Sequence, residues 1–363
     1  MIDKPTILTL DAGGTNFVFS AMRNRKLLVE PIVRPAQAHD LDLCIKELVS
    51  GFENIRSQLD HSPHAVSFAF PGPADYEHGI LGNLPNFAAF NGDVPLAAIL
   101  EHHLKIPVFI NNDGDLFAFG EATSGYLPWL NDKLAEANNP KRFKNLIGIT
   151  LGTGVGAGIV INGQLLRGDN TCAAEIHNMS NYSNLKWNCE ESVSTRAIQR
   201  IYAEASGHPF NANLLPGDIY KIATGEKSGN REAAINSFEA FGKALGNVIC
   251  DVVTLIDGIV VLGGGITAGW DLFGAHVMAE INKVFEDFKG DQNPRLSVRL
   301  YDLNDEQEFN KFLIGNQKTA QVYGTEKTIS FDGEPRVGLG ISRQGASRSI
   351  MLGAYDYAVS RLG

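Results

Sequence analysis

The chain has 363 residues, 44% of them apolar and 20% charged, an ordinary balance for a globular protein long enough for two domains. The formal net charge of −10 argues against a nucleic-acid partner, because binding to a phosphate backbone relies on basic patches. No apolar stretch is long enough to span a bilayer, and the first residues lack the apolar core of a signal peptide. The four cysteines lie far apart and form no disulfide-scaffold pattern. We therefore expect a cytoplasmic protein without a membrane partner.

The first third of the chain predicts an α/β domain that opens with antiparallel strands. Apolar runs at 6–10, 17–22 and 27–33 indicate three strands. From Leu41 to Leu59 the apolar residues recur at steps of four and three, which predicts an amphipathic helix with Asp40 as its N-cap. The same patterns predict further strands at 65–70 and 107–110 and helices at 95–103 and 115–124.

The segment Leu127 to Asn145 is rich in Pro, Asn and Lys, so we expect a break in regular structure and a domain boundary near it. A second cycle then opens as the first did, with strands at 146–151 and 157–161 around a glycine turn. This echo predicts a duplicated topology. The remaining predicted elements are helices at 192–206, 230–255, 271–288 and 347–361, and strands at 258–262, 295–303 and 328–331. The order of elements within 292–340 is left open.

Two glycine-rich loops each follow an apolar run, at 11–16 and 152–156. Glycines let the backbone approach an anion, Thr15 adds a hydroxyl donor, and Asp11 could hold a hydrated Mg²⁺ against phosphate oxygens. In the second loop Thr153 would face the terminal phosphate. A plain hairpin turn explains the first loop as well, and a bulged hairpin the second. The chain lacks the Gly-Lys-Ser/Thr of a Walker motif.

A third run, Gly263-Gly264-Gly265, follows an apolar strand and precedes a helix. A flat purine or ribose could lie against this bare backbone, although an ordinary helix-initiating turn explains the residues equally well. Together the three runs supply the candidate nucleotide-binding residues, which are Asp11, Gly13, Gly14, Thr15, Gly152, Thr153, Gly154, Gly263 and Gly264.

Between the loops, Asn112 and Asp113 stand where a strand ends and a helix begins. The amide of Asn112 can orient a hydroxyl-rich ligand, and Asp113 can accept the proton of an attacking hydroxyl. Alternatively, Asp113 and Asp115 simply cap the following helix, and both interpretations can hold together, with Asp115 capping and Asp113 catalysing.

Three further polar residues, Glu175, His177 and Glu191, could bind sugar hydroxyls or could belong to the plain surface. A zinc site is not expected, because Cys172, His177 and Cys189 lack the close pairing that zinc usually has.

These motifs, in this order, resemble the ROK family of repressors, open reading frames and sugar kinases. The resemblance runs almost end to end, and it rests on the loops already described together with the motifs Phe70-Pro71-Gly72-Pro73, Leu84-Pro85-Asn86 and Gly120-Glu121. It implies an α/β protein with two actin-like, ribonuclease H-like domains and a cleft between them. We expect an N-terminal domain at 1–125, completed by a C-terminal helix at 345–363, and a larger domain at 126–344.

The resemblance also implies roles for individual residues. Asp113 would be the general base for the 6-hydroxyl of the sugar, with Asn112 and Asn86 as sugar ligands. Glu175 matches the glutamate of the family's Glu-x-Gly-His motif, and Glu191 matches the acidic residue that closes the zinc loop. Nucleotide-contacting positions of the family match Gly13, Thr15, Gly152, Thr153 and Gly264.

This sequence departs from the family pattern at several points. The Glu-x-Gly-His motif is one residue short, as Glu175-Ile176-His177, and the cysteine-rich zinc loop is reduced to Cys189. Asn-Asp-Ala-Asn has become Asn112-Asp113-Gly114-Asp115, which adds a negative charge beside the base. The stretch after Arg295 is longer than usual. Repressor members carry a helix-turn-helix before the first strand, whereas this chain opens with its strand at Thr6.

We therefore expect an ATP-dependent hexokinase that uses Mg²⁺ and phosphorylates the 6-hydroxyl of glucose or an N-acetylhexosamine. The alternative is a sugar-binding sensor or regulator that has kept the cleft and lost catalysis. A protein-directed ATPase would need a peptide-binding domain after the ATPase, for which a chain ending at Gly363 leaves no room. Relatives are often dimers, so a homodimer is an expectation from the resemblance.

Overall fold

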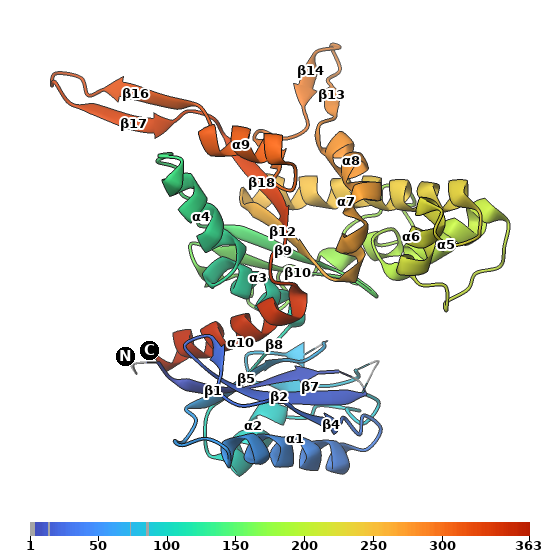
Figure 1. Cartoon of the computed structure of the whole chain (residues 1–363), viewed down its shortest axis with the longest axis vertical. Helices are drawn as coiled ribbons and strands as arrows, with labels where there is room; N and C mark the ends of the chain where they lie inside the picture. The colour runs from blue at the N-terminus through green and yellow to red at the C-terminus, as the bar shows by residue number, and fades with distance from the viewer. Residues whose placement is uncertain (1–3, 14, 73, 85–86) are drawn as a thin grey trace.

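The computed structural model describes residues 4–13, 15–72, 74–84 and 87–363. They form two lobes, each built on its own sheet, with the helices α3 (Asp113–Thr123) and α10 (Ala346–Leu362) stacked between them (Figure 1). No helix in these ranges is both long and apolar enough to cross a membrane.

The first lobe is a mixed sheet covered on its outer face by two helices. In space its strands run β3-β2-β1-β5-β8, with β4 also paired to β2; β1 and β2 are antiparallel, whereas β1, β5 and β8 are parallel. Helix α1 buries Phe52 against Phe19, with ring centroids 5.1 Å apart. The elements are β1 (Thr6–Ala12), β2 (Asn16–Arg23), β3 (Lys26–Leu27), β4 (Ile32–Pro35), α1 (Leu41–Arg56), β5 (Ala65–Ala69), β6 (Ala74–Asp75), β7 (Ile80–Leu81), α2 (Leu96–Leu104) and β8 (Val108–Asn111).

The second lobe repeats this plan, which confirms the predicted duplication. Its sheet runs β11-β10-β9-β12-β18-β15, again an antiparallel hairpin followed by parallel strands. The strands are β9 (Leu146–Leu151), β10 (Val155–Ile161), β11 (Gln164–Leu165), β12 (Ile259–Gly263), β15 (Arg299–Asp302) and β18 (Arg336–Ile341).

Both faces of this second sheet are covered, which is why its strands read as nearly continuous apolar runs. On one face of the sheet, alternate side chains such as Ile147 and Val260 pack with α7 (Arg231–Ile256) and α8 (Trp270–Ile281). On the other face, the intervening side chains, such as Leu146 and Val261, pack with α3 and α4. The other elements of this lobe are α4 (Tyr126–Glu136), η1 (Ile176–Asn178), η2 (Cys189–Glu191), α5 (Thr195–Ser206), α6 (Pro216–Thr224), η3 (Gly265–Gly269), β13 (Val284–Glu286), β14 (Gln292–Pro294), α9 (Glu306–Ile314), β16 (Gln317–Gln321) and β17 (Thr328–Asp332).

Helices α3 and α10 join the lobes through an unusually close contact. A Cβ on Gly120 of α3 would lie 2.0 Å from the carbonyl oxygen of Ser349 in α10, and a Cβ on Gly353 would clash with that of Leu116. Since α3 packs on the second sheet and α10 on the first, each helix rests on one lobe. We propose on this packing that the first lobe ends near Asn112 rather than at residue 125.

Three predicted elements were wrong in extent. The expected break at 127–145 holds α4, because Pro128 sits in the first helical turn, where its missing N–H has no intrahelical partner to lose. The helix predicted over 271–288 stops at Ile281, and the residues after it form the hairpin of β13 and β14. The side chain of Asp287 holds the turn of this hairpin by accepting the N–H groups of Lys289 and Asp291. The strand predicted at 27–33 is interrupted, leaving β3 and β4 on either side.

Candidate active site

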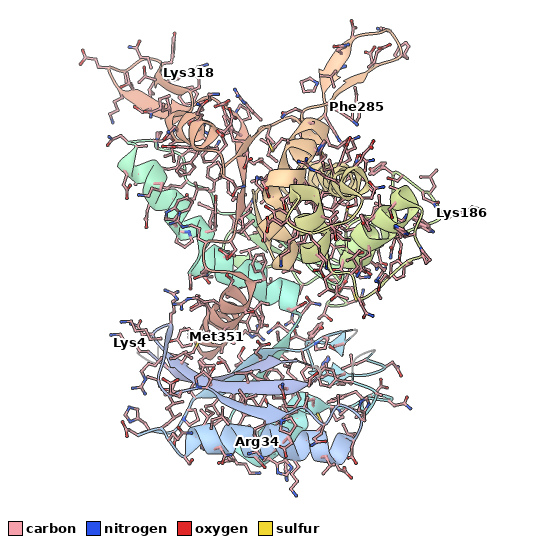
Figure 2. All side chains as sticks on the ribbon, turned by 45° about the vertical axis from the view of Figure 1, so that its right-hand side comes forward. Lys4, Arg34, Lys186, Phe285, Lys318 and Met351 are labelled. Carbon is pink, nitrogen blue, oxygen red and sulfur yellow. The ribbon has the colours of Figure 1, made fainter. Side chains whose placement is uncertain are left out.

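Two cavities meet at Asp113, which lines both; the first is otherwise lined by the first lobe and α10, and the second by Asn112 and the second lobe. The first, of about 510 Å³, lies at the carboxyl ends of β1 and β5, beneath the first turn of α10; Figure 2 labels its lining residue Met351. The second, of about 410 Å³, is bounded by the β9–β10 turn, the end of β12 and η1. A group held in either cavity can therefore reach the same carboxylate.

The strand-to-helix junction presents Asp113 to the cleft. Asn112 is the N-cap of α3: its side-chain oxygen accepts the N–H of Gly114 at 2.7 Å, and a carboxylate oxygen of Asp113 accepts the same N–H at 2.8 Å. The Asp113 side chain is open to solvent in the cleft, yet protein crowds it on its other sides. This desolvation raises the pKa of Asp113, and the Gly114 hydrogen bond offsets part of the rise. A carboxylate with a raised pKa is a better proton acceptor at neutral pH.

Asp115 does not cap the helix, contrary to the prediction from the sequence. It is buried, and burial raises its pKa to about 7, against the opposing pull of Arg167 and with help from the charges of Glu175 and Asp113. Arg167 also crosses between lobes, since its Nη1 donates to Glu77 at 3.1 Å and to the Tyr357 hydroxyl at 2.8 Å. Within the described residues the other two nitrogens of Arg167 are buried without a hydrogen-bond partner.

The first glycine loop is the turn of the β1–β2 hairpin. The N–H of Gly13 donates to the Asn16 carbonyl at 3.1 Å, and the carbonyl of Thr15 accepts from Ala36 at 2.9 Å. Asp11 is exposed at the end of β1 and lines the first cavity. Gly14, the fourth predicted residue of this loop, lies outside the described residues, as does Asn86.

The second glycine loop is held open toward the second cavity. The carbonyl of Gly152 accepts both the backbone N–H and the hydroxyl of Thr195, each at 2.9 Å, which fixes the turn on the start of α5. Gly152, Thr153 and Gly154 all line the cavity, and a Cβ on Gly152 would meet no atom within 4 Å.

Not every glycine of this run faces the cavity. A Cβ on Gly158 would lie 2.4 Å from the carbonyl oxygen of Gly114, so this glycine permits close packing of β10 on α3. The third run divides in the same way: Gly263 packs on the ring of Phe117, whereas Gly264 and Gly265 line the second cavity. Gly264 has a φ of +93°, a conformation that favours glycine.

Glu175 and His177 both reach the second cavity despite the shortened motif. The Nδ1 of His177 lies 2.9 Å from a carboxylate oxygen of Glu175, which leaves the opposite edge of the imidazole free to face a ligand. The buried thiol of Cys189 donates to the Ile176 carbonyl at 2.9 Å and so ties η2 to η1.

Of the neighbouring glutamates 190 and 191, Glu190 lines the second cavity, whereas the sequence predicted Glu191 as the sugar ligand. Glu190 also accepts the N–H of Val155 at 3.2 Å, which places its carboxylate against the glycine loop. Arg196 pairs with both Glu190 and Glu191, each at 2.7 Å, but Glu191 is not among the described residues around either cavity.

The donors available for a metal are carboxylates. In the described ranges no three His, Cys, Asp or Glu residues are grouped to hold a metal ion. A single carboxylate, that of Asp11, is enough to hold a Mg²⁺ ion whose other ligands are water and phosphate oxygens. Magnesium sites of this kind use only one or two protein carboxylates. The one arginine or lysine among the described lining residues of the two cavities is Arg348, in the first turn of α10.

Sequence reasoning missed Glu190 and Arg348 as lining residues of the cavities, and Arg167 as a contact between the lobes. Two glutamates stand side by side at 190–191, and their order along the chain gives no indication of which one faces inward. Arg348 comes from an element remote in sequence from the motifs, and Arg167 stands between the second glycine loop and Glu175 without matching either motif.

Comparison with known proteins supplies the family. The ROK family model matches residues 7–301. An N-acetyl-D-glucosamine kinase of Vibrio cholerae is 28% identical over 268 residues, covering 71% of this chain and 83% of that protein.

Solved structures give the same picture. A glucokinase from Parabacteroides distasonis shares 46% identity and a TM-score of 0.90, over 99% of this chain and 98% of that one. A ROK family glucokinase from Streptomyces griseus, in complex with glucose and AMPPNP, has a TM-score of 0.61 at 18% identity over 99% of this chain and 100% of that one, and it shows the fold alone. The predicted pair of actin-like α/β domains is confirmed, and the chain belongs to the ROK family.

Proposed function

We propose that this protein transfers the terminal phosphoryl group of ATP to the 6-hydroxyl of glucose or of an N-acetylhexosamine, with Asp113 as the general base. The protein is an ATP-dependent sugar kinase; the acceptor hydroxyl, the choice of sugar and the residue roles are the proposal. The observation that carries it is the position of Asp113 on the wall shared by two cavities, one lined by Asp11 at the end of β1 and the other by the glycine loop 152–154.

The reaction requires one proton transfer and one exchange of bonds at phosphorus. The Asp113 carboxylate takes the proton of the attacking hydroxyl, whose oxygen bonds to the γ-phosphorus as the bond from that phosphorus to the bridging oxygen breaks and ADP leaves. The raised pKa of Asp113 favours this proton transfer near neutral pH. Phosphoryl transfer otherwise depends on positioning and on charge neutralisation.

The sugar would occupy the part of the second cavity beside η1, and the nucleotide the part beside the glycine turns. Glu175, His177 and Glu190 supply acceptors and a donor around it, and charge-assisted hydrogen bonds of this kind hold sugar hydroxyls. Asn112 has its side-chain oxygen engaged by Gly114 and so offers its amide N–H groups to the ligand. The similarity to a glucokinase and to an N-acetyl-D-glucosamine kinase supports these two sugars as candidates.

The phosphates would lie between the glycine turns of the two lobes. The hydroxyls of Thr15 and Thr153 would be donors to the phosphates, since the N–H groups of Gly13 and Gly152 donate to the carbonyls of Asn16 and Gly154 within the turns. Asp11 would hold Mg²⁺ through water, and that ion would neutralise phosphate charge. Gly264 would leave room for the nucleoside beside the end of β12.

The position of Arg348 supports a role in charge neutralisation. The two cavities are lined by the carboxylates Asp11, Asp113, Glu175 and Glu190, and ATP brings further negative charge. A guanidinium beside Asp11 would offset part of this repulsion.

The proposal places the enzyme in the cytoplasm, with a hexose and ATP as its ligands and no nucleic-acid or membrane partner. The four cysteines are free thiols, three of them buried, as expected in a reducing compartment. Burial raises the pKa of Cys44 to about 12 and that of Cys250 to about 11, which keeps them protonated and unreactive.

The first test measures ADP release from the purified protein with Mg-ATP, across hexoses and N-acetylhexosamines, each against a blank without sugar. Release stimulated by one sugar identifies the substrate. ATP binding without stimulation by any of them would favour the sugar-binding sensor instead.

The second test concerns the base. Asp113→Asn should lower kcat by about 10²–10⁴-fold while the dissociation constant for the sugar, measured by calorimetry, changes little. The matched control is Asp132→Asn, which removes an exposed carboxylate of α4 outside both cavities. Turnover by Asp113→Asn equal to that of the control would exclude Asp113 as the base.

A further inference from the structure

The acidic and imidazole side chains around the second cavity come from the two ends of one loop, residues 175–192, here called the site loop. Glu175 and His177 stand at its start and Glu190 stands near its end, and all three line the cavity. Between them residues 179–188, all of which the structure describes, form no helix and no strand. An irregular segment of this length leaves the separation of its ends free unless other contacts fix it.

Asn181 ties the two halves of the site loop together from within. Its side chain is buried, and its Nδ2 donates to the Asn188 carbonyl at 3.0 Å and to the Ser192 hydroxyl at 2.8 Å. Its Oδ1 accepts the N–H groups of Ser183 at 2.9 Å and Asn184 at 3.2 Å. An asparagine amide has two donor hydrogens and two acceptor positions, so all of its hydrogen-bonding capacity is in use. This side chain therefore joins the start of the loop to its end and shapes the turn between them.

Cys189 makes a second tie across the same loop. Its buried thiol donates to the carbonyl of Ile176 at 2.9 Å. Ile176 lies between Glu175 and His177 in the chain, and Glu190 follows Cys189 directly. The hydrogen bond of the thiol therefore joins the backbone that carries the first two cavity side chains to the backbone that carries the third.

The side chains of the site loop do not fit a metal ion. The loop stands where the family pattern has its cysteine-rich zinc loop, of which Cys189 is the cysteine that remains. A zinc-bound thiolate has no proton to donate, whereas the Sγ of Cys189 lies at hydrogen-bonding distance from a carbonyl oxygen, which can only accept. Burial also raises the pKa of this thiol to about 11, which keeps it protonated. Among the residues that the structure describes, no three His, Cys, Asp or Glu side chains are grouped to hold an ion.

We propose that Asn181 and Cys189 form a metal-free clamp that positions the sugar-binding side chains of the second cavity. The clamp is the set of hydrogen bonds that this amide and this thiol make within the site loop. Neither residue is among the described residues that line the cavity, so both are positioning residues that act through Glu175, His177 and Glu190. The inference rests on the proposed function, because it takes the second cavity as the site of the sugar.

The clamp acts mainly on Glu175 and His177. Glu190 has further supports, since Arg196 pairs with it at 2.7 Å and it accepts the N–H of Val155 at 3.2 Å. The carboxylate of the proposed base is held at the start of α3, in a separate part of the chain. Hydrogen bonds to sugar hydroxyls weaken steeply with distance and angle, so a loosened clamp lowers the affinity for the sugar. An interaction lost equally from the ground state and the transition state raises KM and leaves kcat unchanged.

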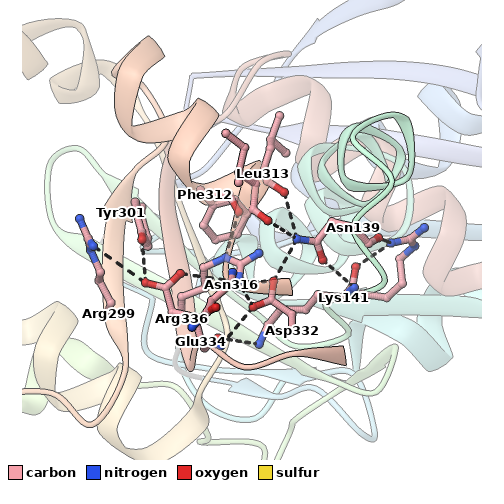
Figure 3. A network of polar contacts seen from close by, with 12 residues as sticks. Asn139, Lys141, Arg299, Tyr301, Phe312, Leu313, Asn316, Asp332, Glu334 and Arg336 are labelled. Carbon is pink, nitrogen blue, oxygen red and sulfur yellow. Dashed lines mark hydrogen bonds and ion pairs between the residues drawn. The ribbon is translucent and has the colours of Figure 1, made fainter. Parts of the chain in front are cut away.

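A second buried asparagine supplies a matched control. The Nδ2 of Asn139 donates to the Leu313 carbonyl at 3.0 Å and to Asp332 at 2.9 Å (Figure 3). Its Oδ1 accepts the N–H of Lys141 at 2.9 Å. Asn139 is 1% exposed and Asn181 is 2% exposed, but Asn139 is not among the described lining residues of either cavity. Removing either amide should therefore cost similar stability, and only the loss of Asn181 should change the affinity for the sugar.

The test compares kcat and the KM for glucose and for N-acetylglucosamine, by ADP release with Mg-ATP, in the wild type and in paired variants. Asn181→Ala should raise KM about 10–100-fold, because it leaves buried polar groups of the loop without partners, and it should change kcat little. Asn139→Ala should lower the melting temperature by a similar amount and keep the wild-type KM.

The cysteine variants separate a hydrogen bond from a metal ligand. Cys189→Ala and Cys189→Ser remove the sulfur alike and differ only in a hydroxyl group. Loss of the donor in Cys189→Ala should raise KM about fivefold, whereas Cys189→Ser keeps a donor and should behave like the wild type. The metal-free clamp would be overturned if Cys189→Ser raised KM as much as Cys189→Ala. A KM that rises in the wild type on addition of the zinc chelator TPEN, with Mg²⁺ in excess, would overturn it as well.

The proposed function and the clamp fail in different ways. Absence of sugar-stimulated ADP release from the wild type would remove the sugar from the second cavity, and both would fall. An active wild type whose KM is matched by that of Asn181→Ala would overturn the clamp alone. Equal rises in KM for Asn181→Ala and Asn139→Ala would trace the effect to a general loss of stability and would also overturn the clamp.

Discussion

Replacing Asp115 by Asn should stabilise the protein at alkaline pH and have little effect below about pH 4. In the folded state burial raises the pKa of Asp115 to about 7, from a value of 3.8. The folded protein therefore holds a proton that the unfolded chain releases, and stability is lost as pH rises from about 4 to about 7.

The size of the effect follows from the two pKa values. Each pKa unit corresponds to about 1.4 kcal/mol, so ionised Asp115 costs about 4 kcal/mol of stability at pH 8. Unfolding entropy is about 2.1 cal/mol/K per residue, or about 0.8 kcal/mol/K for this chain. The variant should thus melt about 5 °C above the wild type at pH 8 and about 2 °C above it at pH 5, with the gain vanishing below about pH 4, where Asp115 is protonated in both the folded and the unfolded state.

The assay is a set of thermal melts of wild type and variant at pH 5, 6, 7 and 8. Asp132→Asn makes the same charge change at an exposed site of α4, so it measures the general effect of net charge and should give no shift. A gain of equal size at pH 5 and pH 8, or none at pH 8, would refute the assignment of a buried and protonated Asp115.

Two further predictions separate neighbouring residues. Gly264→Ala should lower stability by about 2 kcal/mol or more, because a Cβ there would lie 2.2 Å from the Leu151 carbonyl oxygen at a φ of +93°; Gly265→Ala, with open space around it, should melt like the wild type. Similar melting of both variants would contradict the close approach of Leu151 to this turn. Glu190→Gln should raise KM for the sugar about 10–100-fold, and Glu191→Gln much less, since only Glu190 lines the cavity. The reverse order in steady-state kinetics would make Glu191 the sugar ligand.

Much of the fold was predictable because local chemistry determines it. The sequence pattern predicts Asp40 as the cap of the first long helix, and its side chain accepts the N–H of Leu43. The strand runs at 6–10, 65–70 and 146–151 lie within one residue or two of β1, β5 and β9. Period-two and period-3.6 patterns survive because each strand and helix must bury one apolar face.

The errors came where a local signal has two meanings. Pro128 contributes to the predicted break at 127–145, although at the start of a helix proline is harmless. The apolar residues at 284–288 continue a helical pattern by composition, yet they belong to a hairpin whose strands are exposed. Sequence pattern alone does not say whether an apolar residue faces a core or solvent.

Motif spacing and strand pattern are properties of the chain, so they were enough to indicate the family, the duplicated topology and most of the residues around the cleft. Which residues of each motif face the cavities, and which only pack against the rest of the protein, is decided by the folded structure. Gly158 supports packing on Gly114 while Gly152 faces the cavity. Asp115 acquires a raised pKa and Asp113 an open position, although they lie on the same helical turn. Burial and the approach of distant backbone made these distinctions, and neither is encoded within any short stretch of residues.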